Sequence, residues 1–305
     1  MAKILVTGSK GTLGTPLVAE LKKRCHDVWQ TDLQHQRDEQ YTRADVSNFR
    51  QLERVFQQDF DYVYHLAAEF GRINGEEYFD TLWTTNVIGT RNIIEWQKKK
   101  KFKLIFASSS EIYGDKIDQS MTEDMPLQRS IIPHNDYALT KWVNEIQIMN
   151  SEKKFKLDTM RLRFFNAYGP GEHYHHYRSV VCLFCYRALF NIPYTVYKNY
   201  HRVFMYIDDF IPTLANAADK FVAGEVVNIG GEEYKSVEEM SSMILEYLGK
   251  DDSFVEYMPE DKHNTQNKIP DISKAKRMFG HNPKTKLKQG IPLTIEWMKK
   301  VYNVN

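Results

Sequence analysis

A tyrosine and a lysine four positions apart could together carry out acid–base chemistry. Tyr137 and Lys141 occur in the segment NDYALTKWVNE, where the pattern predicts a helix over residues 136–150. In a helix, side chains four residues apart lie on the same face, so the phenol and the ammonium group would be neighbours. An ordinary amphipathic helix could also contain such a pair, so other features of the sequence must decide between the two interpretations.

The oxidation of an alcohol is the chemistry that suits this pair. A base must take the hydroxyl proton while a hydride leaves the carbon, and a free tyrosine, with a pKa of about 10, is a poor base at neutral pH. A nearby ammonium group favours the phenolate and lowers that pKa. Lys141 therefore carries the charge that Tyr137 would need to act as a catalytic base.

A glycine-rich segment near the N-terminus has the features of a dinucleotide site. The segment TGSKGTLG follows an apolar run that predicts the first strand and precedes a predicted helix. Glycines in such a turn let the backbone approach a pyrophosphate at the helix N-terminus. The predicted phosphate-binding residues are Gly8, Gly11, Thr12, Leu13 and Gly14.

An acidic residue at the end of the second predicted strand indicates which dinucleotide would bind. Asp32 stands 18 residues after Gly14. Its carboxylate can accept both hydrogen bonds of an adenosine ribose diol and would repel a 2′-phosphate. We therefore expect the cofactor to be NAD rather than NADP, although Arg37 and Arg43 lie nearby in the sequence.

Strand-like and helix-like segments alternate through the first half of the chain. The predicted strands are 3–7, 28–31, 62–66, 104–107 and 158–164, and the predicted helices include 86–97 and 136–150. Such alternation implies parallel strands joined by right-handed crossovers. We expect an α/β fold with a doubly wound, parallel, Rossmann-type sheet and a smaller C-terminal substrate lobe. Residues 1–166 would form the NAD-binding domain, with a later return near 204–230, and residues 167–305 would form mainly the substrate lobe.

The composition argues against several other classes of protein. The chain has 305 residues, 42% hydrophobic and 27% charged, with a net charge of +1. This balance gives no electrostatic basis for binding nucleic acid, and no stretch approaches the roughly 18 apolar residues of a membrane span. No secretory signal is visible, so we expect a cytoplasmic protein. The closely spaced His173, His175 and His176 lack a carboxylate or cysteine at ligand spacing, so we expect no metal site.

The chain resembles the extended short-chain dehydrogenase/reductase family over residues 3 to about 288, within the NAD-dependent nucleotide-sugar epimerases and dehydratases. The spacing GxxGxxG is typical of that family. Further cofactor-side matches are Asp45 and Val46 in RADVSN, Leu66, Ala67 and Ala68 in YHLAAE, and Asn86 in TNVIGT. The resemblance implies that the first pair holds the adenine, the next three residues lie under the cofactor, and the asparagine braces the central strands. It also implies that Tyr137 and Lys141 contact the cofactor, with Lys141 hydrogen-bonded to the nicotinamide ribose.

Two residues in LIFASSSEIYG complete the catalytic set that the resemblance implies. Ser109 takes the position that hydrogen-bonds the reacting hydroxyl, although Ser108 and Ser110 flank it. Glu111 is similar to the glutamate of GDP-mannose 4,6-dehydratases and UDP-glucuronate decarboxylases. In a dehydratase this glutamate removes the C5 proton, but the aspartate that glucose-type dehydratases place before it is replaced here by Ser110. Glu111 could equally be a polar residue that shapes the pocket.

The second half of the chain resembles the substrate side of the same family. The segment RFFNAYGP implies that Asn166 donates a hydrogen bond to a sugar nucleotide, and IPYTVYKNYHRVF implies that Tyr197 lies near the base and Arg202 at the diphosphate. A guanidinium suits a diphosphate because it donates in a fork. Lys268 stands where the family usually has an arginine, so diphosphate binding would differ there. A surface or packing role is the alternative for each of these residues.

Two segments depart from the common pattern and could line the pocket near the sugar. These are EFGRINGEEYFDTLW, which contains Arg72, and HYHHYR, which ends at Arg178. Either one could accommodate a sugar with a longer side chain, such as a heptose.

We therefore expect an NAD-dependent enzyme that oxidises C4 of a nucleotide-diphosphate sugar, as a 4-dehydrogenase or 4-epimerase. A GDP-heptose in surface polysaccharide biosynthesis would fit the two unusual segments. The alternative is a 4,6-dehydratase that uses Glu111. A non-catalytic NAD-sensing protein is a more remote alternative, because such proteins typically lose the pair formed here by Tyr137 and Lys141.

The resemblance also implies a homodimer or higher homo-oligomer. In the family, the helices near 86–97 and 137–150 form a bundle between subunits. Their apolar residues here are Ile93, Ile94, Trp96, Trp142, Ile146 and Met149. Burial within one chain would produce the same apolar pattern.

Overall fold

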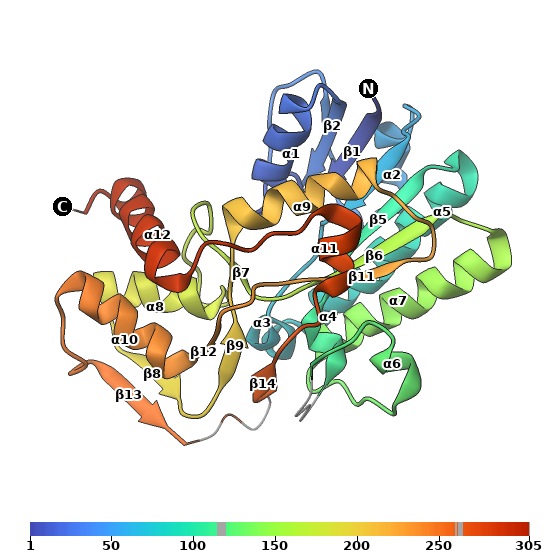
Figure 1. Ribbon diagram of the computed structural model, residues 1–305. Helices are drawn as coiled ribbons and strands as arrows, with labels where there is room; N and C mark the ends of the chain where they lie inside the picture. The colour runs from blue at the N-terminus through green and yellow to red at the C-terminus, as the bar shows by residue number, and fades with distance from the viewer. Residues whose placement is uncertain (115–119, 260, 262–264, 305) are drawn as a thin grey trace.

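A seven-stranded sheet forms the centre of the computed structural model, which describes residues 1–114, 120–259, 261 and 265–304 (Figure 1). Its strand order is β11-β6-β5-β4-β1-β2-β3, and every neighbouring pair is parallel. The strands are β1 (Lys3–Thr7), β2 (Asp27–Asp32), β3 (Tyr41–Arg43), β4 (Tyr62–His65), β5 (Lys103–Ser109), β6 (Thr159–Phe164) and β11 (Val226–Ile229). The predicted doubly wound parallel sheet is confirmed.

Helices cover both faces of this sheet because successive side chains of each strand point to opposite faces. Ile4 and Val6 of β1 pack with α1, α9 and α11, whereas Leu5 between them packs with α2 and α5. Beside α5 lies α7, which also contacts β5. These helices are α1 (Gly14–Lys23), α2 (Phe49–Val55), α5 (Gly89–Lys100), α7 (Asp136–Phe155), α9 (Ile207–Asp219) and α11 (Ser273–Phe279).

The order of the strands reverses at β1, which pairs with β2 on one side and β4 on the other. In open α/β sheets, ligands bind beyond the carboxyl ends of the strands at such a switch point. The glycine turn follows β1, Asp32 ends β2, and the segment HLAA ends β4. The topology therefore brings three separate sequence matches to one edge of the sheet.

A smaller group of elements lies beside the sheet (Figure 1). Helices α8, α10 and α12 pack on one another around an apolar core that includes Cys185, Met240 and Ile295. The elements here are β7 (Ala167–Tyr168), α8 (Val180–Leu189), β8 (Tyr194–Tyr197), β9 (His201–Val203), β10 (Met205–Tyr206), β12 (Tyr234–Ser236), α10 (Val237–Leu248), β13 (Val255–Met258), β14 (Asn267–Lys268) and α12 (Leu287–Tyr302). Among the described residues, no helix combines the length and apolar character needed to cross a bilayer.

The helix predicted over residues 86–97 starts earlier than expected. Helix α4 (Phe79–Trp83) runs into a π-helical turn at Thr84–Ile88 and then into α5. Tertiary contacts support this extension. The Trp83 indole donates to Asp136, and the Asn86 amide donates to the Glu69 carbonyl and the Thr140 hydroxyl. A π turn has no signature in hydrophobic periodicity, so the pattern placed the start too late.

Three of the apolar residues expected between subunits are buried within the chain. Ile93 and Ile94 have no exposed surface and Trp96 has 9%. Ile93 and Trp96 pack against the sheet with α2, which is the alternative of burial within one chain. Ile146 on α7 is 39% exposed and remains accessible. The expected homo-oligomer stays a prediction.

Candidate active site

The turn after β1 has no room for side chains at two of its glycines. Gly8 has a φ of +68°, and a Cβ there would lie 2.6 Å from the backbone N of Ala67. A Cβ on Gly14, where α1 begins, would lie 2.0 Å from the carbonyl O of Gly8. The predicted phosphate-binding residues Gly8, Gly11, Thr12, Leu13 and Gly14 all lie in this turn. A bare backbone facing the start of a helix fits the pyrophosphate of a dinucleotide.

The carboxylate of Asp32 is held at the end of β2 beside this turn. Its Oδ2 accepts a hydrogen bond from the backbone N–H of Lys10 at 2.9 Å, and its Oδ1 accepts one from the N–H of Leu33 at 2.7 Å. The acid is thus oriented by the glycine turn itself. This is the place where the ribose diol of NAD would meet it.

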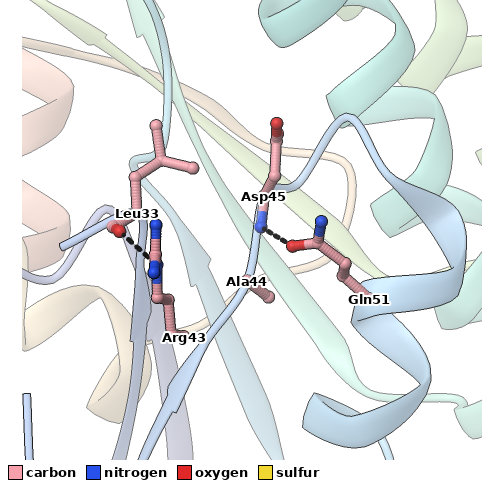
Figure 2. Close-up of a pocket in the computed structure, with 5 residues that line it drawn as sticks. All are labelled: Leu33, Arg43, Ala44, Asp45 and Gln51. Carbon is pink, nitrogen blue, oxygen red and sulfur yellow. Dashed lines mark hydrogen bonds between the residues drawn. The ribbon is translucent and has the colours of Figure 1, made fainter. Parts of the chain in front are cut away.

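A cavity of about 430 Å³ opens next to the end of β3 (Figure 2). Its lining residues are Leu33, Arg43, Ala44, Asp45 and Gln51. Asp45 is placed by its backbone N–H, which donates to Gln51 at 2.8 Å, and the Arg43 side chain donates to the Leu33 carbonyl at 2.8 Å. Asp45 therefore lines the same cavity as Leu33, the residue that follows Asp32, and the neighbouring Val46 is buried. That the adenine binds here stays a prediction.

A chain of hydrogen bonds supports the backbone at the end of β4. The Thr7 hydroxyl accepts from the N–H of Ala67 at 3.2 Å and contacts Nδ1 of His65 at 2.9 Å. Nε2 of the same histidine contacts the Thr90 hydroxyl at 3.1 Å. Burial, with a smaller effect from Lys141, lowers the pKa of His65 to about 3, so its imidazole is neutral. Leu66, Ala67 and Ala68 follow directly.

Asn86 braces the next part of this segment. Its amide N–H groups donate to the Glu69 carbonyl and the Thr140 hydroxyl, and its carbonyl accepts from the N–H of Glu69 at 2.9 Å. It therefore ties the segment after β4 to the catalytic helix α7. Sequence reasoning singled out Asn86 but missed Thr7, Thr90 and Thr140, for which no spacing gave a signal.

Tyr137, Ser109 and Lys141 meet where β5 ends and α7 begins. Tyr137 is the second residue of α7, and the Ser109 hydroxyl lies near enough to its phenol to lower the pKa of that phenol. The ammonium of Lys141, one turn further along, lies 5.8 Å from the centre of the Tyr137 ring and donates to the Ala107 carbonyl at 2.8 Å. Ser108 instead donates to the buried Glu145. Of the neighbouring serines 108 and 109, the structure therefore brings 109 to the tyrosine.

Burial dominates the titration of both side chains. It raises the pKa of Tyr137 to about 12, with the Ser109 hydroxyl lowering it and Glu111 raising it less strongly. Burial also lowers the pKa of Lys141 to about 8, against the opposing charge of Glu145. At neutral pH the pair is thus a phenol beside an ammonium. Additional positive charge near the phenol would be needed to form the phenolate.

Glu111 lies at the centre of a cluster of charged groups drawn from distant parts of the chain. Its carboxylate forms an ion pair with Lys268 of β14, whose side chain is 2% exposed. Burial acts to raise the pKa of Glu111, but Lys268, followed by Arg202 and Arg72, holds it below the usual value. Arg202 is beside Lys268 in the paired strands β9 and β14. Glu111 is therefore an anion here.

The remaining substrate-side residues occupy varied positions. Arg202 is 5% exposed and donates to the carbonyls of Gln266 and Thr265. The Asn166 amide donates to the Val203 carbonyl at 3.0 Å. Tyr197 is half-buried on β8, with its ring 6.2 Å from that of Tyr200. Arg202 lies within electrostatic reach of Glu111, and Tyr197 is linked to this cluster through Tyr200, whose hydroxyl bonds to the backbone of Asp261. Among the described residues, no recorded side-chain contact joins Asn166 to Glu111.

The two unusual segments pack against each other. The Arg178 guanidinium lies 4.7 Å from the ring centre of Phe70, and the Tyr177 hydroxyl donates to Glu77. The two backbones also approach closely, because a Cβ on Gly71 of the first segment would lie 2.9 Å from the carbonyl O of Tyr177 in the second. The sequence singled out both segments separately, and only the fold shows that they form one wall.

Helix α3 (Arg72–Glu77) connects this wall to the catalytic centre. Its Gly75 packs at the start of α7, where a Cβ would lie 3.5 Å from the backbone N of Tyr137. Arg72 forms an ion pair with Asp261 at 2.8 Å, and Asp261 is 8% exposed. Asp261 was missed because nothing in its neighbourhood marks it. The wall thus lies beside the cluster around Glu111.

A glycine turn closed to side chains, an oriented acid at the second strand and a Ser–Tyr–Lys centre define a dinucleotide-dependent oxidoreductase. The model of the NAD dependent epimerase/dehydratase family matches residues 4–230. The chain belongs to this family, and its cofactor is NAD.

Individual relatives extend over nearly the whole chain. A UDP-N-acetyl-alpha-D-glucosaminuronate decarboxylase from Bacillus cytotoxicus is 30% identical, with 99% of both chains covered. The solved structure of a UDP-glucose 4-epimerase from Thermotoga maritima with UDP-glucose superimposes with a TM-score of 0.88 at 27% identity, covering 98% of this chain and 99% of that one. A UDP-glucuronic acid 4-epimerase from Bacillus cereus, in complex with UDP-glucuronic acid and NAD, gives 0.86 at 27% identity, covering 98% and 100%.

Replacing Asp32 should weaken the preference for NAD over NADP. We expect Asp32→Ser to weaken NAD binding by about tenfold to a hundredfold, since hydrogen bonds to a charged group contribute roughly 1.5–3 kcal/mol. NADP binding should improve because a 2′-phosphate would no longer meet a carboxylate. Calorimetric titration of both cofactors would measure this. Asp27→Ser, at the opposite end of β2, is the control, and equal loss in both variants would contradict the role of Asp32.

Proposed function

We propose that this protein uses NAD to oxidise the C4 hydroxyl of a UDP-sugar. The observation that carries the proposal is the meeting of Ser109, Tyr137 and Lys141 beside the glycine turn. NAD, when bound, accepts the hydride from C4. Tyr137 takes the hydroxyl proton, Ser109 hydrogen-bonds the same oxygen, and the Lys141 ammonium favours the phenolate. The relatives named above act on UDP-sugars, which supports this nucleotide over the GDP-heptose considered from the sequence.

The positive charges around Glu111 favour one particular class of sugar. Lys268, Arg202 and Arg72 face Glu111, and Arg72 also forms ion pairs with Asp261 and Glu76. Glu76 is 44% exposed and therefore screened by solvent, so the less exposed groups, three cations and two carboxylates, keep a surplus of one positive charge. A sugar that carries a carboxylate on C5 would offset this surplus, whereas a neutral hexose would not. We therefore propose a UDP-hexuronate as the substrate.

A hexuronate oxidised at C4 could react further with no second oxidant or reductant, given a proton for C5 from solvent or a nearby acid. Its C5 carboxylate is β to the new ketone, so the bond from C5 to the carboxyl carbon can break, with release of carbon dioxide and uptake of a proton at C5. Return of the hydride to C4 then gives a pentose. Return to the other face without loss of carbon dioxide gives the C4 epimer. Decarboxylation is the second candidate activity, and the decarboxylase from Bacillus cytotoxicus among the relatives supports it.

Dehydration by Glu111 fits the site less well. A general base must gain a proton during the reaction, and the cations around Glu111 lower its pKa and with it its basicity. The ion pair with Lys268 would also have to open before the carboxylate could reach C5. We propose instead that this pair shapes the pocket around the substituent on C5.

Product analysis separates these outcomes. Purified protein with NAD would be given UDP-glucose, UDP-glucuronate, UDP-N-acetylglucosaminuronate or a GDP-heptose, and products would be identified by mass spectrometry and NMR. Loss of carbon dioxide supports decarboxylation, unchanged mass with inverted C4 supports epimerisation, and loss of water supports dehydration. Absence of any reaction at C4 with all UDP-sugars would contradict the proposed function.

Removing the charge of Lys268 should affect acidic and neutral substrates differently. We expect Lys268→Met to raise KM for UDP-hexuronates about tenfold to a hundredfold, because a charge-assisted hydrogen bond of roughly 1.5–3 kcal/mol is lost. The KM for UDP-glucose should change much less. Lys235→Met is the matched control. Lys235 lies on β12, in the same small sheet as β9 and β14, and its ammonium forms an ion pair with Glu239. Equal losses on both substrates would argue against carboxylate recognition.

A further inference from the structure

Three residues of α7, each four positions apart, contact three consecutive residues of β5. The Tyr137 phenol lies near the Ser109 hydroxyl, which lowers the pKa of the phenol, the Lys141 ammonium donates to the Ala107 carbonyl at 2.8 Å, and Glu145 accepts from the Ser108 hydroxyl at 2.5 Å. Helical spacing places all three on the face of α7 that meets the strand. Glu145 thus belongs to the same row as the catalytic pair, one turn beyond Lys141.

Glu145 is a buried anion with a strong partner. Its side chain has no exposed surface, and both of its oxygens accept from Arg163 of β6, at 2.9 and 2.8 Å. Arg163 is itself 1% exposed and also donates to the Tyr113 hydroxyl and the Glu123 carbonyl. Apolar groups of similar size can often replace a buried ion pair with no loss of protein stability. The contribution of the Glu145–Arg163 pair to stability therefore does not by itself explain why Glu145 lies next to the catalytic lysine.

We propose that Glu145 is a positioning residue that keeps Lys141 protonated while Tyr137 ionises. The proposal rests on the role of Tyr137 as the base in the proposed function. Among the described residues, the titratable groups recorded near Lys141 are Tyr137 and Glu145 on α7 and His65 on β4, and Arg163 of β6 is the cation paired with Glu145. The Phe106 ring of β5 packs 5.2 Å from the ammonium. His65 is neutral, so Glu145 supplies the negative charge that opposes desolvation of the ammonium.

Coupling between the two catalytic groups explains why this matters. When the pair loses one proton, the result is either a phenolate beside an ammonium or a phenol beside a neutral amine. Only the first form has the catalytic base. An anion one turn beyond Lys141 lies closer to the ammonium than to the phenol, so it favours the first form. Burial lowers the pKa of Lys141 to about 8, only slightly above neutral pH. Without the negative charge of Glu145 this pKa would fall further, and the neutral amine would become more populated.

The test is a titration of Tyr137 in the NAD-saturated protein. The near-ultraviolet absorbance of the phenolate would be followed against pH, with Tyr137→Phe subtracted. Glu145→Gln preserves the shape of the side chain but removes its charge, and its amide NH2 cannot accept from Arg163 as the second carboxylate oxygen does. In this variant we expect the phenolate to appear at least about one pH unit higher than in the unaltered protein. Turnover at neutral pH should fall about tenfold, in proportion to the lost phenolate.

A second glutamate on the same helix provides the matched control. Glu152 pairs with Arg161 at 3.4 Å, again between α7 and β6, but two turns beyond Glu145. Glu152→Gln should leave the Tyr137 titration unchanged. If Glu145→Gln also leaves it unchanged, or moves it no more than Glu152→Gln does, the inference is overturned.

A double variant covers the case in which a single change prevents folding. Glu145→Gln combined with Arg163→Gln leaves no unpaired buried charge, and it should show the same upward shift of the phenolate. A midpoint at the original pH in a folded double variant would overturn the inference. Because the titration needs no sugar substrate, its result is independent of whether a UDP-sugar is turned over, so failure of the proposed function is recognised separately.

Discussion

Tyr137→Phe should lower kcat by about a thousandfold while NAD still binds. Loss of a positioned general base typically removes a factor of about 10² to 10⁴, and the phenol is the only group that the proposed mechanism gives to the C4 hydroxyl proton. Because the phenol acts in the transition state, kcat and kcat/KM should fall together. Steady-state assays with the best substrate from the screen, together with calorimetric titration of NAD, would measure both parts.

The control for this variant is a second buried tyrosine away from the site. Tyr64→Phe removes a hydroxyl that donates to the Leu214 carbonyl beneath the sheet, so it should reduce stability and leave turnover per folded molecule unchanged. Full turnover in Tyr137→Phe would contradict the proposed mechanism. It would also revive the interpretation that the fold serves as a non-catalytic NAD sensor.

Gly8→Ala should abolish measurable NAD binding. The added Cβ would lie 2.6 Å from the backbone N of Ala67, closer than real Cβ atoms approach such a group. The turn after β1 and the end of β4 would have to separate, which removes the surface on which the pyrophosphate rests. Calorimetric or fluorescence titration with NAD measures the loss, and thermal unfolding reports whether the fold survives.

Gly249→Ala separates this steric effect from simple backbone strain. Gly249 has a φ of +64°, nearly that of Gly8, but a Cβ there meets no atom within 4 Å. Both variants should therefore lose about 1 kcal/mol of stability from the left-handed conformation. Only Gly8→Ala should lose cofactor binding. If both variants bind NAD equally well, the close approach to Ala67 is not what forms the site.

Features that depend on local spacing were accessible from the sequence. The glycine turn, the acid that ends the second strand and the Tyr137–Lys141 pair each lie within one strand–turn–helix unit or one helix. Their geometry follows from the helical and strand repeats. Alternating segments likewise predicted the parallel sheet, because a parallel connection requires a crossover. The start of the helix before Asn86 was misplaced because a π turn depends on tertiary hydrogen bonds.

Only the tertiary structure decided which distant charges meet. Glu111 and Lys268 are 157 residues apart, and Arg72 pairs with Asp261 across 189 residues. No repeat length relates such positions, since the path of the chain between them determines their contact. The four-residue step from Lys141 to Glu145 was visible in the sequence. Its burial and its partner Arg163 were not, because they depend on β6 lying beside β5 in the sheet.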